Sequence, residues 1–241
     1  TAHLDDNAVD ILIGENGNLY IGGTSRLVSQ RAFVLIKTDS ELGDIWQKTH
    51  TLYYGADLRK IHFNSATQNI AITGNYTDWE NLYLSAVVVY DKDGNKIFDE
   101  YYRTLGNRSA VGFDVIANHD NTVYVCGYES NEETNLWDAL LMKYDAVGEI
   151  TWSKKVYAES LPAVFKSIIT DNSGNVYVTG MSGDNAITAK YESDGNLLWM
   201  QTHSSKMGFS TVDTHESIKQ SDDGDIFITA RNLPANGGGA M

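Results

Sequence analysis

A short apolar strand motif recurs along the chain at an almost constant spacing. Its copies begin at residues 19, 70, 123, 176 and 226, so successive copies start 51, 53, 53 and 50 residues apart. The first four copies end in Gly, at positions 23, 74, 127 and 180, and the fifth has Ala at position 230. Such a repeat predicts a fold built from similar units, in which each unit buries its apolar faces against its neighbours.

Two further landmarks keep the same register. An apolar residue lies eight or nine positions before each copy of the motif, at Ile11, Ile61, Val115, Ile168 and Ile218. A large aromatic residue follows a glycine-containing turn in four units, at Trp46, Phe98, Trp152 and Trp199. The turn glycines of these units are Gly43, Gly94, Gly148 and Gly195. Three landmarks in one register indicate that the whole unit is repeated.

Each unit is expected to contain four short antiparallel strands. In the first unit they lie near residues 9–13, 19–23, 33–37 and from 45 onward. Dipeptides such as Asn16-Gly17, Asp93-Gly94 and Asp194-Gly195 separate neighbouring strands, and they favour tight hairpin turns.

A repeated four-stranded unit of about 50 residues predicts an all-β fold, a β-propeller with four complete blades and a partial fifth. We expect one domain over residues 1–241, with repeats at approximately 1–54, 55–106, 107–160, 161–206 and 207–241, the last one incomplete. The fifth repeat stops where its third strand is expected to start. The sequence therefore predicts that the natural chain continues or that a neighbour supplies the missing strands.

The fourth repeat resembles the SBBP repeat of bacterial propellers. The resemblance rests on Gly174-Asn175-Val176-Tyr177-Val178-Thr179-Gly180, then Ala186 to Lys190-Tyr191, then Asp194-Gly195 to Trp199. The second copy departs from this pattern, because Thr67-Gln68-Asn69 replaces its Gly-Asn turn. The resemblance implies an exported protein located outside the cell, on the cell surface or in the periplasm. It implies no shared catalytic residue.

Composition excludes several classes of function. The formal net charge is −14, from 18 basic and 32 acidic residues, and no cationic stripe suited to nucleic acid is present. No apolar run reaches the ~20 residues that span a bilayer. The only cysteine, Cys126, occupies a small-residue strand position and is expected to pack in the core.

The sequence predicts no cofactor and no metal site. The six histidines have no metal-ligand spacing. The acidic segments 91–95 and 222–225 resemble calcium loops only superficially, because each falls where a hairpin turn is required.

A binding site is expected on one face of the propeller. Turns between the second and third strands, together with the connections between units, leave the same face, which we name the long-loop face. The predicted loops between second and third strands cover residues 24–31, 75–83, 128–137, 181–185 and 231–239. Function tends to be carried by loops that a rigid scaffold holds in place.

Aromatic and acidic residues gather on these predicted loops. The candidate ligand-binding residues are Trp79, Trp137, Tyr76, Tyr83, Tyr128, Asp78 and Glu80. Aromatic rings suit both protein contacts and the apolar faces of sugars. The alternative is that the rings pack over the ends of the blades and that the acidic groups only face solvent.

Two functional interpretations follow. The first is a non-catalytic exported module that presents its long-loop face to a protein or a glycan, with a structural variant in which it is a subunit of a cell-surface assembly. The second is a carbohydrate-active enzyme with carboxylates at the mouth of the central channel, for which the candidates are Asp10, Asp57, Asp114 and Asp213. Convergence of these carboxylates in one pocket favours the enzyme, whereas pairing within the core disfavours it.

Overall fold

The computed structural model describes residues 6–26, 30–51, 54–104, 106, 108–157, 161–183, 185–203, 217–221 and 223–229. The first sheet contains β1 (Asp6–Ile13), β2 (Leu19–Arg26), β3 (Arg31–Thr38) and β4 (Asp44–Thr51). The second sheet contains β5 (Gly55–Phe63), β6 (Ile70–Thr77), β7 (Tyr83–Tyr90) and β8 (Lys96–Tyr102). The third sheet contains β9 (Ala110–Ala117), β10 (Val123–Ser130), β11 (Trp137–Tyr144) and β12 (Ile150–Val156). The fourth sheet contains β13 (Ala163–Thr170), β14 (Val176–Ser182), β15 (Asn185–Tyr191) and β16 (Leu197–His203). A two-stranded sheet follows, with β17 (Ser217–Gln220) and β18 (Ile226–Thr229), and a short 3-10 helix, η1 (Glu15–Gly17), joins β1 to β2.

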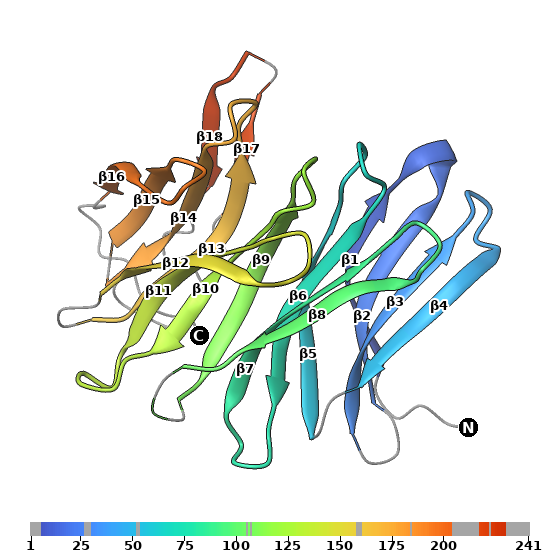
Figure 1. Cartoon of the computed structure of the whole chain (residues 1–241), viewed down its shortest axis with the longest axis horizontal. Helices are drawn as coiled ribbons and strands as arrows, with labels where there is room; N and C mark the ends of the chain where they lie inside the picture. The colour runs from blue at the N-terminus through green and yellow to red at the C-terminus, as the bar shows by residue number, and fades with distance from the viewer. Residues whose placement is uncertain are drawn as a thin grey trace, which may run out of the picture.

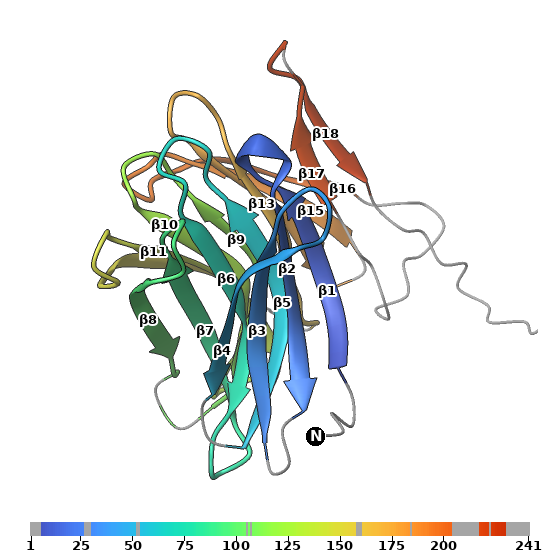
Figure 2. The same cartoon turned by 90° about the vertical axis from the view of Figure 1, so that its right-hand side faces the viewer.

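The sheets stand side by side in chain order, and each is an antiparallel meander (Figure 1). The first strand of each sheet packs on the sheet before it. Thus β5 contacts β1 to β3, β9 contacts β5 to β7, β13 contacts β9 to β11, and β17 contacts β13 and β14. Figure 2 shows the same stack from the side of β1. This radial arrangement of four-stranded antiparallel sheets confirms the predicted all-β, propeller architecture.

An aspartate organises several of the turns within the sheets in the same way. Oδ1 of Asp91 accepts hydrogen bonds from the backbone N–H groups of Asp93 and Asn95, at 2.9 and 2.8 Å. Asp39, Asp145 and Asp171 make the same pair of bonds in their own turns. The carboxylate therefore replaces the backbone acceptor that a tight turn lacks, which agrees with the turn interpretation of segment 91–95.

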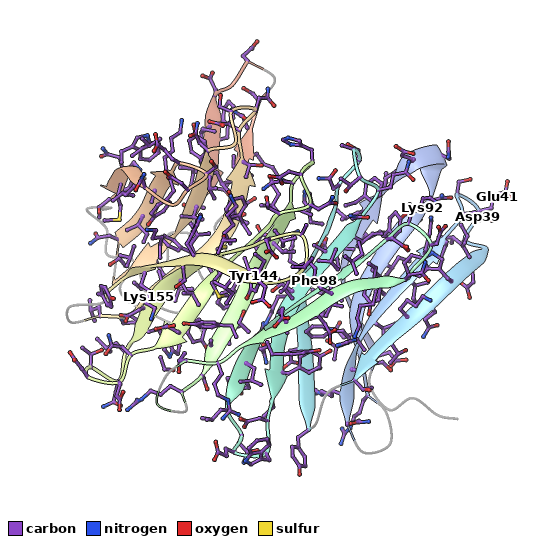
Figure 3. All side chains as sticks on the ribbon, viewed as in Figure 1. Asp39, Glu41, Lys92, Phe98, Tyr144 and Lys155 are labelled. Carbon is purple, nitrogen blue, oxygen red and sulfur yellow. The ribbon has the colours of Figure 1, made fainter. Side chains whose placement is uncertain are left out.

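Three apolar clusters fill the spaces between successive sheets. Successive residues of one strand face opposite clusters: Ile70 and Ile72 face the first sheet, while Ala71 faces the third. Phe98 and Tyr144 belong to the cluster between the second and third sheets (Figure 3). Because both faces of an inner sheet are covered, the second and third strands are nearly continuous apolar runs.

In the first three sheets the repeated aromatic residue of the fourth strand contacts a turn of the next sheet. Trp46 donates its indole N–H to the backbone oxygen of Lys92, at 3.2 Å, and Trp152 donates in the same way to Ser193. A Cβ atom added to Gly94 would lie 3.1 Å from Trp46, and one added to Gly195 would lie 3.0 Å from Trp152. The aromatic and glycine landmarks of the sequence thus meet between neighbouring sheets rather than within one unit.

One expectation about the strands is wrong. The motif glycines were expected to end the second strands, but these strands continue for two or three residues beyond them. The predicted loops 75–83 and 128–137 shrink to the connections 78–82 and 131–136, and predicted loop residues such as Tyr76 and Tyr128 lie in strands.

Among the described residues, no helix has the length and apolarity that a membrane crossing requires.

Candidate binding site at the inner strands

The first strand of each of the four larger sheets lies nearest the centre of the propeller, and we call it the inner strand. Every inner strand carries a β-bulge at the same place. The strand pairing skips Val9 in β1, Arg59 in β5, Phe113 in β9 and Lys166 in β13. A bulge residue has no partner across the ladder, and the local kink turns its side chain away from the ordinary alternation. The four bulges therefore place the side chain of one bulge residue per sheet at the centre of the propeller.

The motif glycines explain why the bulges recur. Gly74 is paired with Leu58, directly before the bulge of β5, and a Cβ on Gly74 would collide with the backbone oxygen of Asp57. Gly127 and Gly180 stand in the same relation to the backbone of β9 and β13. Only glycine permits this close approach of two backbones, so the glycine that defines the repeat also supports the bulge.

A cavity of about 740 Å³ opens where the bulges meet. Its wall includes all four bulge residues together with Thr24, Arg31, Asp57, Lys60, Asp114 and Ser167. The strand positions of these residues place the cavity toward the long-loop face, because Thr24 lies near the end of β2 and Arg31 begins β3. The wall is both polar and charged, which suits a hydrophilic ligand.

The carboxylates of the inner strands are engaged with neighbouring groups. Asp57 pairs with Arg31 at 2.9 Å, and Asp10 pairs with Lys60 at 3.1 Å. Asp114 is buried and accepts hydrogen bonds from the Ser167 hydroxyl and the Ile168 N–H, at 2.9 and 3.1 Å.

Burial raises the pKa of Asp114 above its ordinary value, although these hydrogen bonds act in the opposite direction. Asp10 and Asp114 both bond a backbone N–H of the next sheet, so they join sheets to each other. Asp213, the fourth candidate, lies outside the described residues.

A strip of three aromatic rings leads from the surface to the cavity. Trp137, with 44% of its surface exposed, stacks on Tyr128 with ring centres 4.8 Å apart and an angle of 26°. Tyr128 in turn contacts Phe113 at 5.8 Å. We name Trp137, Tyr128 and Phe113 the aromatic strip.

Two cations lie on the inner end of the aromatic strip. Lys166 Nζ is 3.7 Å and Arg59 Cζ is 5.6 Å from the centre of the Phe113 ring. The pKa of Tyr128 is raised, chiefly by burial and then by nearby Tyr83, and Arg59 acts in the lowering direction. Tyr83, 41% exposed, therefore belongs to the same neighbourhood.

The remaining predicted residues form a different group. Trp79, at 61% exposure, lies on the turn between β6 and β7, and the guanidinium of Arg103 lies 5.5 Å from its ring. Arg103 also pairs with buried Asp78 and, at 3.5 Å, with Glu80. Asp78 further accepts the N–H groups of Glu80 and Leu82, so it holds the turn together.

Tyr76 offers no ring face to a ligand. It is 1% exposed, contacts Phe33 with ring centres 4.4 Å apart, and donates its hydroxyl to the backbone oxygen of His50. Tyr76 was expected to lie in a loop with its ring on the surface. Instead β6 continues through this residue and turns its side chain into the core.

No family model matches this sequence, and no curated protein sequence shows significant similarity to it. Solved structures do resemble it. A protein of unknown function from Bacteroides caccae superposes with a TM-score of 0.53 at 13% identity, over 88% of this chain and 64% of that protein. An exo-beta-1,3-galactanase from Clostridium thermocellum gives a TM-score of 0.50 at 14% identity, over 91% of this chain and 53% of the galactanase. The polysaccharide lyase Uly1 gives 0.52 at 11% identity, over 94% and 54% of the two chains.

The chain shares their fold. At these identities the similarity extends to the fold alone, and the chain spans between 53% and 64% of the length of the three proteins.

The sequence interpretation missed Phe113, Arg59 and Lys166. A signal was present, because these residues and Val9 each lie two positions before an apolar landmark, at Val115, Ile61, Ile168 and Ile11. Aligning the repeats on that landmark places all four in one column.

Within the described ranges, no group of three or more His, Cys, Asp or Glu side chains is arranged to hold a metal ion. Cys126 is fully buried in the cluster between the third and fourth sheets, and burial raises the pKa of its thiol.

Proposed function

We propose that this chain is an exported, non-catalytic propeller module that binds a glycan on its long-loop face. The observation that carries the proposal is the aromatic strip, which runs from exposed Trp137 to Phe113 in the cavity wall. Sugars present apolar faces that stack on aromatic rings and hydroxyls that need polar partners, and the strip and the cavity wall offer both.

Two further points support the proposal. Two of the proteins that share the fold are named as a galactanase and a polysaccharide lyase. The resemblance to SBBP repeats supports export and a cell-surface or extracellular location. A subunit of a cell-surface assembly is compatible with the same site.

Substitution of Trp137 tests the site directly. Binding of the purified chain to a glycan array identifies a ligand, and calorimetry then measures its affinity. We expect Trp137→Ala to weaken binding about tenfold or more, because a stacked aromatic contact contributes roughly 1–2 kcal/mol. Trp79→Ala is the matched control, since it removes another exposed tryptophan ring that lies outside the aromatic strip, and it should leave the affinity unchanged.

Three results would count against the proposal. Equal losses in the two variants would place the ligand elsewhere on the long-loop face. Array binding that neither variant alters would remove the aromatic strip from consideration. The chain could also bind no glycan but bind a protein, with that binding lost in Trp137→Ala. This result would assign the aromatic strip to a protein partner.

A carbohydrate-active enzyme is the second candidate. It is favoured by Asp57 and Asp114, which both line the cavity, and by the raised pKa of Asp114, since a glycosidase needs one protonated carboxyl. The ion pair of Asp57 with Arg31 and the hydrogen bonds of Asp114 assign both groups a structural part and favour the binding module. Release of new reducing ends from the array ligand, lost in Asp57→Asn, would establish the enzyme instead.

A further inference from the structure

The bulge residues concentrate positive charge in the cavity of an acidic protein. The chain has a formal net charge of −14, yet four of the six charged residues in the cavity wall are cationic: Arg31, Arg59, Lys60 and Lys166. A cavity that reverses the sign of the surrounding surface raises the local concentration of anions.

The cations of the cavity wall differ in how closely carboxylates approach them. Arg31 is matched by Asp57 and Lys60 by Asp10, so their charges are balanced locally. Arg59, in contrast, has no carboxylate partner among the residues that the structure describes, and its guanidinium lies against the Phe113 ring. The aromatic face attracts the cation, but this contact leaves the positive charge uncompensated.

The position of Arg59 and Lys166 fits the recognition of one particular group. Both side chains contact the same ring, Phe113, which is the inner end of the aromatic strip. A guanidinium binds a carboxylate through two parallel hydrogen bonds, and a nearby ammonium adds a point charge. An aromatic ring beside this pair suits the apolar face of the sugar ring that carries the carboxylate.

We propose that the cavity selects an acidic sugar, with the carboxylate of a uronic acid bound by Arg59 and Lys166 and its ring lying along Phe113. This inference rests on the proposed glycan-binding function and names the ligand class of the same site. Neutral glycans lack the group that Arg59 and Lys166 recognise, so they bind the aromatic strip without the contribution of the cavity.

The test compares uronic-acid oligosaccharides with the same oligosaccharides after complete methyl esterification, on an array and then by calorimetry. Esterification removes the negative charge and keeps the sugar ring. We expect the acid form to bind about tenfold more tightly or better, because a hydrogen bond to an ionised carboxylate is stronger than one to a neutral ester. The advantage should shrink at high salt, since added ions screen the cavity.

Variants assign the effect to the two cations. Arg59→Gln and Lys166→Gln should each reduce affinity for the acid form and leave that for the ester unchanged. Lys92→Gln is the matched control, because it removes one positive charge on the turn between β7 and β8, at the opposite face. Equal binding of acid and ester by the wild-type chain, or equal effects of Arg59→Gln and Lys92→Gln, would overturn the inference while leaving glycan binding intact.

A second measurement separates this inference from the proposed function. Nuclear magnetic resonance of the arginine side chains follows a titration with D-glucuronate and, separately, with its methyl ester. A shift of the Arg59 signal with the acid alone supports the anion site even if no oligosaccharide binds the array. Absence of that shift at millimolar D-glucuronate would refute it, whatever the array shows.

Discussion

Single polar residues join neighbouring sheets, and one of them, the partly buried His62, can be followed through its protonation. Its Nδ1 accepts a hydrogen bond from the Ala117 N–H of the third sheet, at 3.2 Å, which requires a neutral ring at that nitrogen. Burial, with smaller contributions from Lys219 and Lys60, lowers the pKa of His62 to about 4. Asn64 reinforces the same junction by donating to the Ala117 oxygen at 2.7 Å.

The lowered pKa of His62 predicts a loss of stability in acid. Because the pKa is 6.5 for an unconstrained imidazole and lower in the folded chain, the stabilisation is complete above about pH 6.5 and is lost as the pH falls toward about 4. We expect the free energy of unfolding in urea to fall by about 1–3 kcal/mol more in the wild type than in His62→Gln over this range. Parallel pH profiles of the two proteins would show that His62 does not titrate differently on folding.

At the scale of the element, the turn between the third and fourth strands is fitted to the sheet before it. Gly195 and Gly174 both have a positive φ, at +89° and +80°, so alanine strains both by about 1–2 kcal/mol. They differ in surroundings. A Cβ on Gly195 would meet Lys154 Cε at 2.6 Å and Trp152 at 3.0 Å, whereas one on Gly174 would meet nothing closer than Ser193 Cβ at 3.9 Å.

We therefore expect Gly195→Ala to destabilise the chain more than Gly174→Ala, by about 1–3 kcal/mol, because it also overpacks the contact with Trp152. Chemical denaturation of both variants gives the difference directly. Trp152→Phe in the Gly195→Ala background should recover part of the loss, because the smaller ring leaves room for the added methyl group. Equal costs for the two alanine variants would mean that the turn does not bear on the preceding sheet.

The sequence predicted the elements better than their junctions. Four antiparallel strands per unit, in chain order, followed from the repeat, because short apolar runs and Asx-Gly turns are local signals. The meeting of Trp152 with Gly195 was not predicted, since the two residues belong to different units and only the stacking of sheets brings them together. The bulge was missed for a related reason: one extra residue in a strand changes no local propensity, and it shows only when strand pairing is known.

The missed bulges and the longer second strands together explain why the predicted residues lie in different surroundings from those expected. Of the predicted aromatic residues, Trp137 and Tyr128 lead to the cavity, but Tyr76 is buried and Trp79 stands apart with Arg103. Loop residues were expected to form the site because loops are exposed. The structure places charged and aromatic side chains on the inner strands instead, where Phe113 and Arg59 occupy positions that strand alternation does not anticipate.

At the scale of the whole molecule, the first sheet differs from the others in one respect. The face of its first strand is exposed, whereas the equivalent face of each later sheet is covered by the sheet before it. Ile11 is 58% exposed, whereas its counterparts Ile61, Val115, Ile168 and Ile218 are between 1% and 4% exposed. Each counterpart packs on the preceding sheet, and no described residue packs in that way on Ile11.

This difference predicts unequal effects for one substitution made at two equivalent positions. Ile61→Ala should cost about 2–5 kcal/mol of unfolding free energy, as expected for a buried isoleucine, while Ile11→Ala in the same 241-residue chain should cost well under about 1 kcal/mol. Urea denaturation of the two variants makes the comparison. A large cost at Ile11 would show that a further part of the protein, or a second copy, covers this face in solution.

The regular placement of the bulges has a consequence for how such a protein changes over evolutionary time. Val9, Arg59, Phe113 and Lys166 stand outside the ladder of paired strands, so replacing one of them disturbs no backbone hydrogen bond between the paired residues. Four codons, one in each repeat, can therefore be rewritten independently of the scaffold. Duplication of a repeat supplies a new copy of the position together with its supporting glycine, and a substitution at that single codon changes the lining of the central cavity.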